Sequence, residues 1–294
     1  MKLRKSVVVF MVFNYVFLSI LALACILPFV HVIAISFSKN AAVSANYVKL
    51  WPVQFTTFAY EYLLTRRAFW RAFLVTIERV LLGGSVNMIL VIMAGYALSK
   101  ESITFKSRTV YVWFFFFTML FSGGIVPLYL LLFQMSLLNN IWSLILPGAL
   151  PIFNLILMIN FFRQIPRDFE EAALMDGASQ FRILWAIYIP CSLPAVATVS
   201  LFTIVAHWNS WFDGLIYMND PANYPLQSYL QTVIIQMNFQ TTNLSPGQLD
   251  NLKFLSDSTL RASQIIIATI PILMVYPMLQ KYFVKGIVLG GVKG

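Results

Sequence analysis

Six long apolar runs, separated by shorter polar segments, organise this chain of 294 residues. A helix needs about 20 apolar residues to cross the hydrocarbon core of a bilayer, and each run is long enough. A helix also satisfies its own backbone hydrogen bonds in lipid, and the alternating pattern typical of membrane barrel strands is absent from the sequence. The pattern therefore predicts an all-α polytopic membrane protein with six transmembrane helices, at about residues 7–35, 72–98, 109–133, 140–162, 191–215 and 262–283.

Composition excludes a water-soluble globule. Hydrophobic residues make up 60% of the chain and charged residues 11%, whereas soluble domains have about 25% charged residues. The two longest polar connections, residues 36–71 and 216–261, are too short to be convincing domains of their own. We therefore expect one permease-like membrane domain over residues 1–294. Prolines recur inside the predicted spans and can kink their helices.

The placement of lysine and arginine predicts which side of the membrane each connection faces. The net charge is +9, and short connections rich in these cations stay in the cytoplasm. Seven cations lie in the first and fifth connections, and twelve lie at the chain ends and in the second and fourth connections: Lys2, Arg4, Lys5, Lys100, Lys106, Arg108, Arg163, Arg167, Arg182, Lys281, Lys285 and Lys293. We therefore expect the N- and C-termini and the fourth connection to be cytoplasmic.

That fourth connection, residues 163–190, is the most polar long segment of the chain. Pro166 is expected to end the preceding span, and Asp168 can cap a new helix. Acidic residues crowd the first turn of this helix, where the helix dipole favours them. Gly177 is expected to end it, and a second short amphipathic piece follows at residues 181–189. The segment therefore predicts a short helix suited to docking.

This short helix has one small or apolar face that could rest on another surface. The face consists of Phe169, Ala172 and Ala173, which fall three and four residues apart. Three acidic residues are expected to remain in water: Glu170, Glu171 and Asp176.

The same residues resemble the EAA-type signature of permease subunits of binding-protein-dependent ABC importers. That signature has E-A-A, a glycine four residues after the second alanine, nine more residues, and then I-x-L-P. The matching positions are Glu171, Ala172, Ala173, Gly177, Ile187 and Pro190, with Ile189 in place of the leucine. The alternative is an ordinary cytoplasmic loop helix with a glycine cap.

The resemblance implies a type I ABC importer permease fold. It also implies that the helix is a coupling helix, which sits in a groove on an ATPase subunit and turns closure of the ATPases into movement of the membrane helices. The coupling-loop residues that it implies are Glu170, Glu171, Ala172, Ala173, Asp176 and Gly177.

The resemblance implies several partners for this chain. They are a second, homologous permease in a heterodimer, two ATPase subunits, an extracytoplasmic solute-binding protein and a carbohydrate substrate, all at the bacterial inner membrane. In character the chain is similar to permeases for oligosaccharides or polysaccharides, including alginate- and aldouronate-type systems. The glycine-rich end of the chain, with Gly290, Gly291 and Lys293, is similar to a permease tail that can reach the ATPase interface; the alternative is a frayed terminus.

The run from His207 to Gly214 mixes indole rings with amide and carboxylate groups near the outer end of the fifth span. Sugars stack their C–H faces on aromatic rings and exchange hydrogen bonds with such polar groups. Candidate substrate-pathway residues are therefore Trp208, Asn209, Trp211, Phe212 and Asp213. An interfacial aromatic belt without a ligand is an equal alternative.

Two ionisable residues, Glu78 and Arg79, lie in the second apolar run. Ionisable groups inside a membrane are costly and often functional, so these two could face a polar pathway or pair with a neighbour. The favoured interpretation starts the hydrocarbon core after Arg79 and lets its side chain extend to the outer interface.

No residues are predicted to form a catalytic, cofactor or metal site. The phosphate-binding pattern G-x-x-x-x-G-K-[ST] is absent, so ATP and Mg²⁺ are expected on partner ATPase subunits. His31 and His207 stand alone, without a zinc-binding pattern. Two alternatives to a sugar permease remain: a permease of the same architecture for a non-sugar solute, and a membrane-embedded enzyme, for which Glu78 and Arg79 are poor support.

Overall fold

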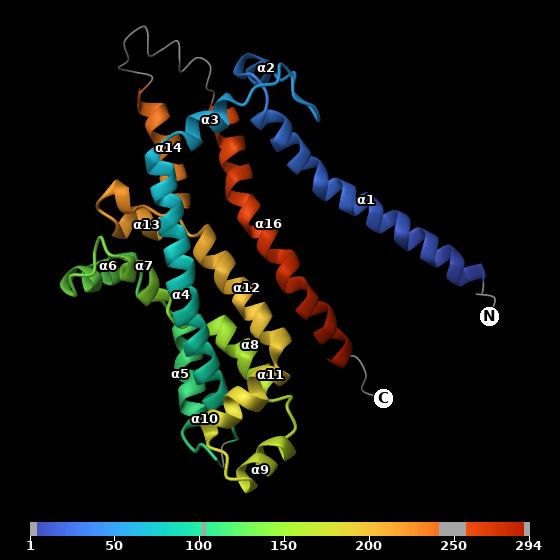
Figure 1. Cartoon of the computed structure of the whole chain (residues 1–294), viewed down its shortest axis with the longest axis vertical. Helices are drawn as coiled ribbons and strands as arrows, with labels where there is room; N and C mark the ends of the chain where they lie inside the picture. Colours follow the sequence, from blue (N-terminus) through green and yellow to red (C-terminus); the bar gives the residue numbers. More distant parts are fainter. Residues whose placement is uncertain (1–4, 102–103, 241–256, 291–294) are drawn as a thin grey trace. The chain divides into compact units, whose positions relative to one another are not determined.

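The structure is a computed structural model that describes residues 5–101, 104–240 and 257–290 (Figure 1). The described residues form helices, and the one isolated antiparallel bridge among them pairs Ser38 with Phe55. The chain forms two compact units. Unit 1 contains Met1–Arg67 and Leu230–Ile270, and unit 2 contains Ala68–Tyr229 and Pro271–Gly294. The expectation of a single permease domain stays a prediction.

The helices of unit 1 begin with a long apolar one. They are α1 (Lys5–Ser36), α2 (Asn40–Ser44), α3 (Phe58–Leu64), the second part of α14 (Leu226–Gln240) and the first part of α16 (Asp257–Gly290). Leu63 of α3 and Leu260 of α16 are fully buried together in a small core. Residues 7–29 of α1 are exposed on all sides, as expected for a helix that crosses a bilayer, whereas Ala34 and Ser36 near its end are buried.

Unit 2 holds most of the helices, in the order α4 (Arg67–Ser99), α5 (Arg108–Leu120), α6 (Ile125–Gln134), α7 (Ile141–Ile145), η1 (Leu146–Gly148), α8 (Ile152–Phe162), α9 (Asp168–Met175), α10 (Gln180–Ile183), η2 (Leu184–Tyr188), α11 (Ile189–Cys191), α12 (Leu193–Asn209), α13 (Phe212–Tyr217) and η3 (Pro221–Asn223). The start of α14 and the end of α16 also belong to it. The prediction of an all-α protein is confirmed.

Within the described residues, three helices are long and apolar enough to cross a membrane by themselves: Val7–Ser36, Arg67–Ser99 and Ser258–Val275. Three bent helix pairs bring the number to six when each pair is taken as one span: Arg108–Leu120 with Ile125–Gln134, Ile141–Gly148 with Ile152–Phe162, and Gln180–Cys191 with Leu193–Asn209. Each of the six predicted apolar runs thus overlaps one such helix or pair. The third, fourth and fifth runs, in which prolines were expected to kink the helix, are each broken into two helices.

The third run bends most sharply, by 111° between α5 and α6. Phe121 leaves α5 in an extended conformation, and Gly124 precedes α6 with φ of 87°. Glycine takes such a φ at little cost because it has no Cβ atom. The 13 residues of α5 therefore rise only about 20 Å, less than the thickness of the hydrocarbon core.

Prolines account for the other two bends, of 50° and 85°. Pro147 lies in η1 and Pro151 immediately precedes α8, while Pro194 follows the break at Ser192. Proline lacks a backbone N–H and cannot continue the hydrogen-bond ladder of a preceding helix. At the break after α7, the backbone carbonyl groups of Leu144, Gly148 and Ala149 accept hydrogen bonds from side chains, which matters for the site below.

The main core of unit 2 joins α4, α8, η2 and α12. Its fully buried members include Val91, Met158 and Val199. Gly95 of α4 permits close packing, because a Cβ atom at this position would lie 2.9 Å from Cγ of Met158. Small residues at helix contacts are a common way to bring membrane helices together.

Candidate functional site

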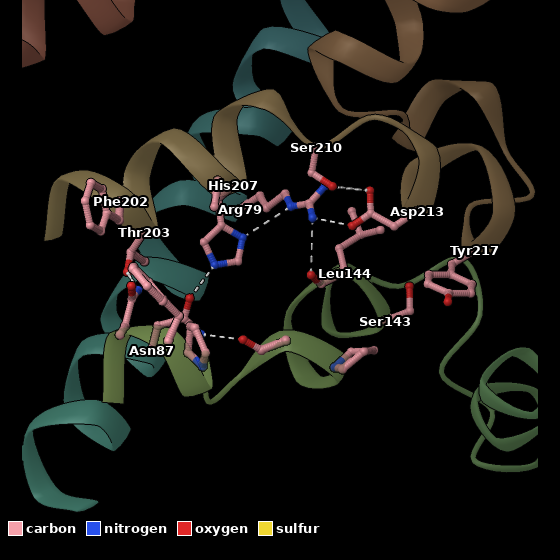
Figure 2. A pocket seen from close by; sticks show the side chains of 16 residues that line it. Arg79, Asn87, Ser143, Leu144, Phe202, Thr203, His207, Ser210, Asp213 and Tyr217 are labelled. Atoms are coloured by element: carbon pink, nitrogen blue, oxygen red, sulfur yellow. Dashed lines mark hydrogen bonds and ion pairs between the residues drawn. The ribbon is translucent and has the colours of Figure 1, made fainter. Parts of the chain in front are cut away.

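A cavity of about 630 Å³ lies within unit 2, between α4, α7, α8, α12 and α13 (Figure 2). Its lining contains charged, amide, hydroxyl and imidazole groups, although the surrounding helices are strongly apolar. Polar groups inside a membrane protein are expensive unless they are paired or functional. The arrangement of these groups therefore indicates what the cavity does.

Arg79 is the central charge of the cavity lining, and its side chain is 3% exposed. Its guanidinium forms a two-pronged ion pair with the carboxylate of Asp213, in which Nη1 lies 3.1 Å from Oδ1 and Nη2 binds Oδ2. Nη2 also faces the carbonyl oxygen of Leu144 at 3.4 Å. Arginine suits such a site because its planar fork matches a carboxylate.

A chain of hydrogen bonds continues from Arg79 through His207 to Asn87 (Figure 2). Nε of Arg79 donates to Nδ1 of His207 at 3.4 Å, so the ring proton lies on Nε2, which donates to Oδ1 of Asn87 at 2.8 Å. Nδ2 of Asn87 donates to the carbonyl oxygens of Gly148 and Ala149 at 2.9 and 2.8 Å. The broken backbone after α7 thereby gains its hydrogen-bond partners.

The favoured sequence interpretation of Arg79, an arginine that extends to the outer interface, is wrong. A membrane-facing arginine reaches water when no partner is nearby. Here Asp213, 134 residues further along the chain, supplies the partner inside unit 2. Glu78 is its neighbour in sequence but does not line the cavity.

Two aromatic rings also belong to the cavity lining. Phe153 and Phe202 lie with ring centroids 6.2 Å apart, and their side chains are 54% and 43% exposed. In the same lining, Nδ2 of Asn154 donates to the Thr203 hydroxyl at 3.2 Å. The cavity therefore offers exposed aromatic rings beside amide and hydroxyl groups.

The structure brings only one of the five candidate pathway residues into this cavity. That residue is Asp213, which also accepts a hydrogen bond from the Ser210 hydroxyl at 2.8 Å. Trp208 is buried edge-on against Phe73. The other three, Asn209, Trp211 and Phe212, are exposed and do not line the cavity. Their role in a substrate pathway stays a prediction.

The spacing of three residues in the sequence could have indicated the helix face that lines the cavity. Arg79, Gly83 and Asn87 recur every four residues in an apolar run, so they share one face of α4. All three are buried. Gly83 makes room for the imidazole, because a Cβ atom there would lie 2.6 Å from Cε1 of His207.

The predicted coupling helix is α9, which lies beyond the C-terminal end of α4 in unit 2 (Figure 1). It begins one residue earlier than a cap at Asp168 requires: Arg167 is the capping residue and Asp168 the first helical one. Arg167 makes no side-chain capping bond, so the acidic residues stabilise this end through the helix dipole.

The C-terminal end of α9 is a Schellman motif. The N–H of Gly177 donates to Leu174 at 3.0 Å, and the N–H of Ala178 donates to Ala173 at 2.9 Å. Gly177 has φ of 77°, a conformation that favours glycine. The prediction that Gly177 ends the helix is confirmed.

Glu170 of α9 was expected to remain in water, and that expectation is wrong. Its carboxylate is not in water but lies 2.6 Å from Nζ of Lys100 and accepts a hydrogen bond from the Tyr188 hydroxyl at 2.7 Å. Glu171 and Asp176 are exposed, as expected. Burial raises the pKa of Glu170, but hydrogen bonds from Lys100 and Tyr188 and the charge of Lys100 outweigh burial and lower it overall.

Large apolar side chains of α9 and of the segment that follows it are exposed. Met175 is 89% exposed, Phe169 53%, and Phe181 and Trp185 lie with ring centroids 6.0 Å apart. Ala172 is also exposed, whereas Ala173 packs against the main core. A surface of this kind is typical of a docking site for another protein.

Comparison with known proteins agrees with this geometry. Residues 5–289 match the family model described as "Binding-protein-dependent transport system inner membrane component". The chain belongs to this family. It is thus a multi-pass inner-membrane permease of a binding-protein-dependent ABC importer, not an enzyme.

Two proteins of Bacillus subtilis are similar to this permease over nearly its whole length. It is 38% identical over 95% of its length to the polygalacturonan/rhamnogalacturonan transport system permease protein YtcP of Bacillus subtilis, of which 96% is covered. Protein LplC of the same organism is 40% identical over 97% of this chain and 95% of its own length.

A solved structure matches the permease at a TM-score of 0.82 and 34% identity, covering 96% of this chain and 99% of the other. It comes from a bacterial ABC transporter involved in the import of the acidic polysaccharide alginate. The fold prediction of an ABC importer permease is therefore confirmed.

The tail of the permease stays untested. Gly290 is the last residue of α16, whereas Gly291 and Lys293 lie outside the described residues.

Proposed function

We propose that this permease forms, with a second homologous permease, the translocation pathway for an acidic oligosaccharide or polysaccharide delivered by an extracytoplasmic binding protein. Support comes from relatives whose names contain polygalacturonan, rhamnogalacturonan and the acidic polysaccharide alginate. The observation that carries the proposal is the cavity of unit 2, where exposed Phe153 and Phe202 lie near amide, hydroxyl and imidazole groups. Sugars need both kinds of surface.

The charge of the cavity suits passage rather than tight binding of a uronide. Asp213 neutralises Arg79, so the guanidinium does not present an unpaired positive charge to an anionic sugar. Stacking and neutral hydrogen bonds would then guide the substrate, and an acidic sugar would not be trapped by a strong ion pair.

The proposal also includes the ATPase subunits and the orientation of the chain in the membrane. Two ATPase subunits bind ATP and Mg²⁺ and dock on the exposed apolar surface at α9, while this chain holds no cofactor of its own. Both chain termini and α9 lie in the cytoplasm, in keeping with the twelve cations of those segments. The glycine-rich tail at Gly290, Gly291 and Lys293 extends toward the ATPase interface.

The test is ATP hydrolysis in proteoliposomes that contain this chain, its partner permease, the ATPase subunits and the binding protein. Oligogalacturonate and alginate oligosaccharides should stimulate hydrolysis and enter the vesicles, whereas a neutral maltooligosaccharide of equal length should do neither. Stimulation by the neutral sugar alone would contradict the acidic substrate class. Stimulation by a non-sugar solute with no response to any glycan would contradict the proposed function itself.

A further inference from the structure

Four side chains meet where α9 faces α4 and η2, and they form what we call the coupling cluster: Tyr96 of α4, Lys100 directly after α4, Glu170 of α9 and Tyr188 of η2. Lys100 Nζ lies 2.6 Å from Glu170 Oε1, and the Tyr188 hydroxyl donates to Glu170 Oε2 at 2.7 Å. Both carboxylate oxygens are therefore bound, each to a different element.

Lys100 is also enclosed by aromatic rings. Its Nζ lies 3.9 Å from the ring centroid of Tyr96 and 4.5 Å from that of Tyr188. The two rings meet edge to face with centroids 4.8 Å apart. An ammonium group over such ring faces is attracted to them, most strongly where water is excluded. The cluster thus holds Lys100 by three contacts at once.

Burial separates this ion pair from an ordinary surface pair. The side chains of Lys100 and Glu170 are 12% and 14% exposed. The other ion pair near α9 joins Arg167 to Glu101, whose side chains are 57% and 49% exposed. Exposed pairs contribute little, whereas breaking a buried pair leaves a charge without a partner.

The cluster connects α9 with two membrane helices. Lys100 follows the last residue of α4, and Tyr188 ends η2, from which the chain runs through α11 into α12. The Tyr96 hydroxyl also hydrogen-bonds Gln180 of α10. A displacement of α9 would therefore pull on both helices that line the cavity with Arg79, Asn87 and His207.

The apolar packing of α9 is slight. No residue of α9 is fully buried, and Ala173 provides its apolar contact with the main core. Coupling between distant sites is carried by packed side chains, hydrogen bonds and ion pairs that connect elements with two discrete arrangements. Small apolar contacts alone would let α9 slide, whereas a buried ion pair with two hydrogen bonds resists it.

We infer that the coupling cluster transmits the movement of α9 to α4 and α12, with Glu170 and Lys100 as positioning residues for ATP-driven transport. This inference rests on the proposed function. It assigns to Glu170 an inward role, distinct from that of the exposed Glu171 beside it.

The experiment compares Glu170→Gln with Glu101→Gln in the complete importer. Each removes one carboxylate charge and one ion pair from the same helix region, but only the first pair is buried. Glu170→Gln should keep the ATPase subunits bound and retain basal hydrolysis, yet lose about fivefold or more of the stimulation by loaded binding protein. Glu101→Gln should respond like wild type.

Two more changes test the individual contacts of the coupling cluster. Tyr188→Phe removes only one hydroxyl group and should lower the stimulation in the same direction but less. Exchanging the charges, with Lys100→Glu and Glu170→Lys together, should recover part of the stimulation that either change alone removes. Such recovery would show that Lys100 and Glu170 act through their contact with each other.

Several results would overturn the inference. One is stimulation in Glu170→Gln equal to that in Glu101→Gln. A second is loss of the ATPase subunits from the purified Glu170→Gln complex, which would mean that the cluster holds α9 for docking and transmits nothing. If wild type itself gives no stimulation with any glycan, the proposed function fails first, and the two failures are thereby distinguished.

Discussion

Two buried ion pairs of unit 2 use different cations, and the difference corresponds to different tasks. Arg79 and Asp213 lie in the wall of the cavity, with Arg79 3% exposed and fixed by Asp213, His207 and a backbone carbonyl. Lys100 and Glu170 lie at the base of the coupling helix, where a single nitrogen sits between two aromatic rings. A guanidinium fork fixes a geometry, whereas an ammonium group is a compact charge on a flexible stem. The cavity pair is thus suited to a rigid wall and the coupling pair to a joint.

The largest expected effect comes from removing one partner of the ion pair between Arg79 and Asp213 in the cavity wall. Asp213→Asn leaves the buried Arg79 charge without its carboxylate and should destabilise the folded permease by about 3–5 kcal/mol. The measurement is the thermal unfolding midpoint of the purified complex in detergent. Because the cost comes from the orphaned charge, replacing both residues, as Arg79→Met with Asp213→Leu, should be less destabilising than Asp213→Asn. Equal loss in the single and double variants would contradict this account.

The next effect concerns the glycine that admits His207 to the cavity wall. A Cβ atom at Gly83 would lie 2.6 Å from Cε1 of His207, whereas one at Gly84 would meet Thr203 only at 4.0 Å. Gly83→Ala should displace the imidazole and cost about 1–3 kcal/mol through overpacking. Gly84→Ala is the matched control in the same helix and should be close to neutral in the same unfolding measurement. Two equal shifts would show that the close approach does not matter.

A smaller effect is expected at the end of the coupling helix. Gly177 has φ of 77°, and a Cβ atom there would meet nothing within 4 Å. A substitution therefore acts only through the backbone, at about 1–2 kcal/mol for a residue that avoids this conformation. Gly177→Val should reduce sugar-stimulated ATP hydrolysis more than Gly177→Asn, since asparagine tolerates positive φ. The reverse order would indicate that the side chain touches a partner.

The smallest effect is on pH dependence. The pKa of Glu170 is lowered by its partners, so its contribution is present above the ordinary range of a glutamate and is lost only as pH falls below it. Burial lowers the pKa of Lys100, so on the alkaline side the pair loses its charge earlier than an ordinary lysine would. The charged and titratable groups around the pair are Tyr96, Tyr188 and the more exposed Arg167.

The ratio of stimulated to basal hydrolysis in wild type, relative to Glu170→Gln, should therefore stay constant as the pH falls from about 7 to 5, because the pKa of Glu170 is lowered. A sharp change of this ratio over that interval would mean that Glu170 titrates there, which the direction of its shift excludes.

The helical nature of the chain and the position of the coupling helix were accessible from sequence. Apolar length predicts a membrane helix because the bilayer imposes a fixed thickness. Gly177 could be placed as a helix end because the left-handed conformation favours glycine whatever the surroundings. The bends were less accessible, since Pro28 lies within the continuous helix α1 whereas Pro147 and Pro151 accompany a break.

The two ion pairs depended on contacts between distant parts of the chain. Arg79 and Asp213 are 134 residues apart, and Lys100 and Glu170 are 70 apart. On sequence grounds Arg79 was expected to reach the membrane interface and Glu170 to stay in water. Either expectation is reasonable for a residue considered alone, because the cost of burying a charge depends on a partner that local sequence does not specify.

The sequence by itself determined the class of this protein: six apolar runs, cations concentrated in alternate connections, and a spaced coupling signature. These features depend on local or lipid-imposed rules, so they can be recognised along one chain. Only the tertiary structure decided that Arg79, Asn87, His207 and Asp213 share one cavity and that Glu170 faces inward. Packing brings such residues together across many turns of chain, and the energy of a buried polar group is set by the neighbours that packing supplies.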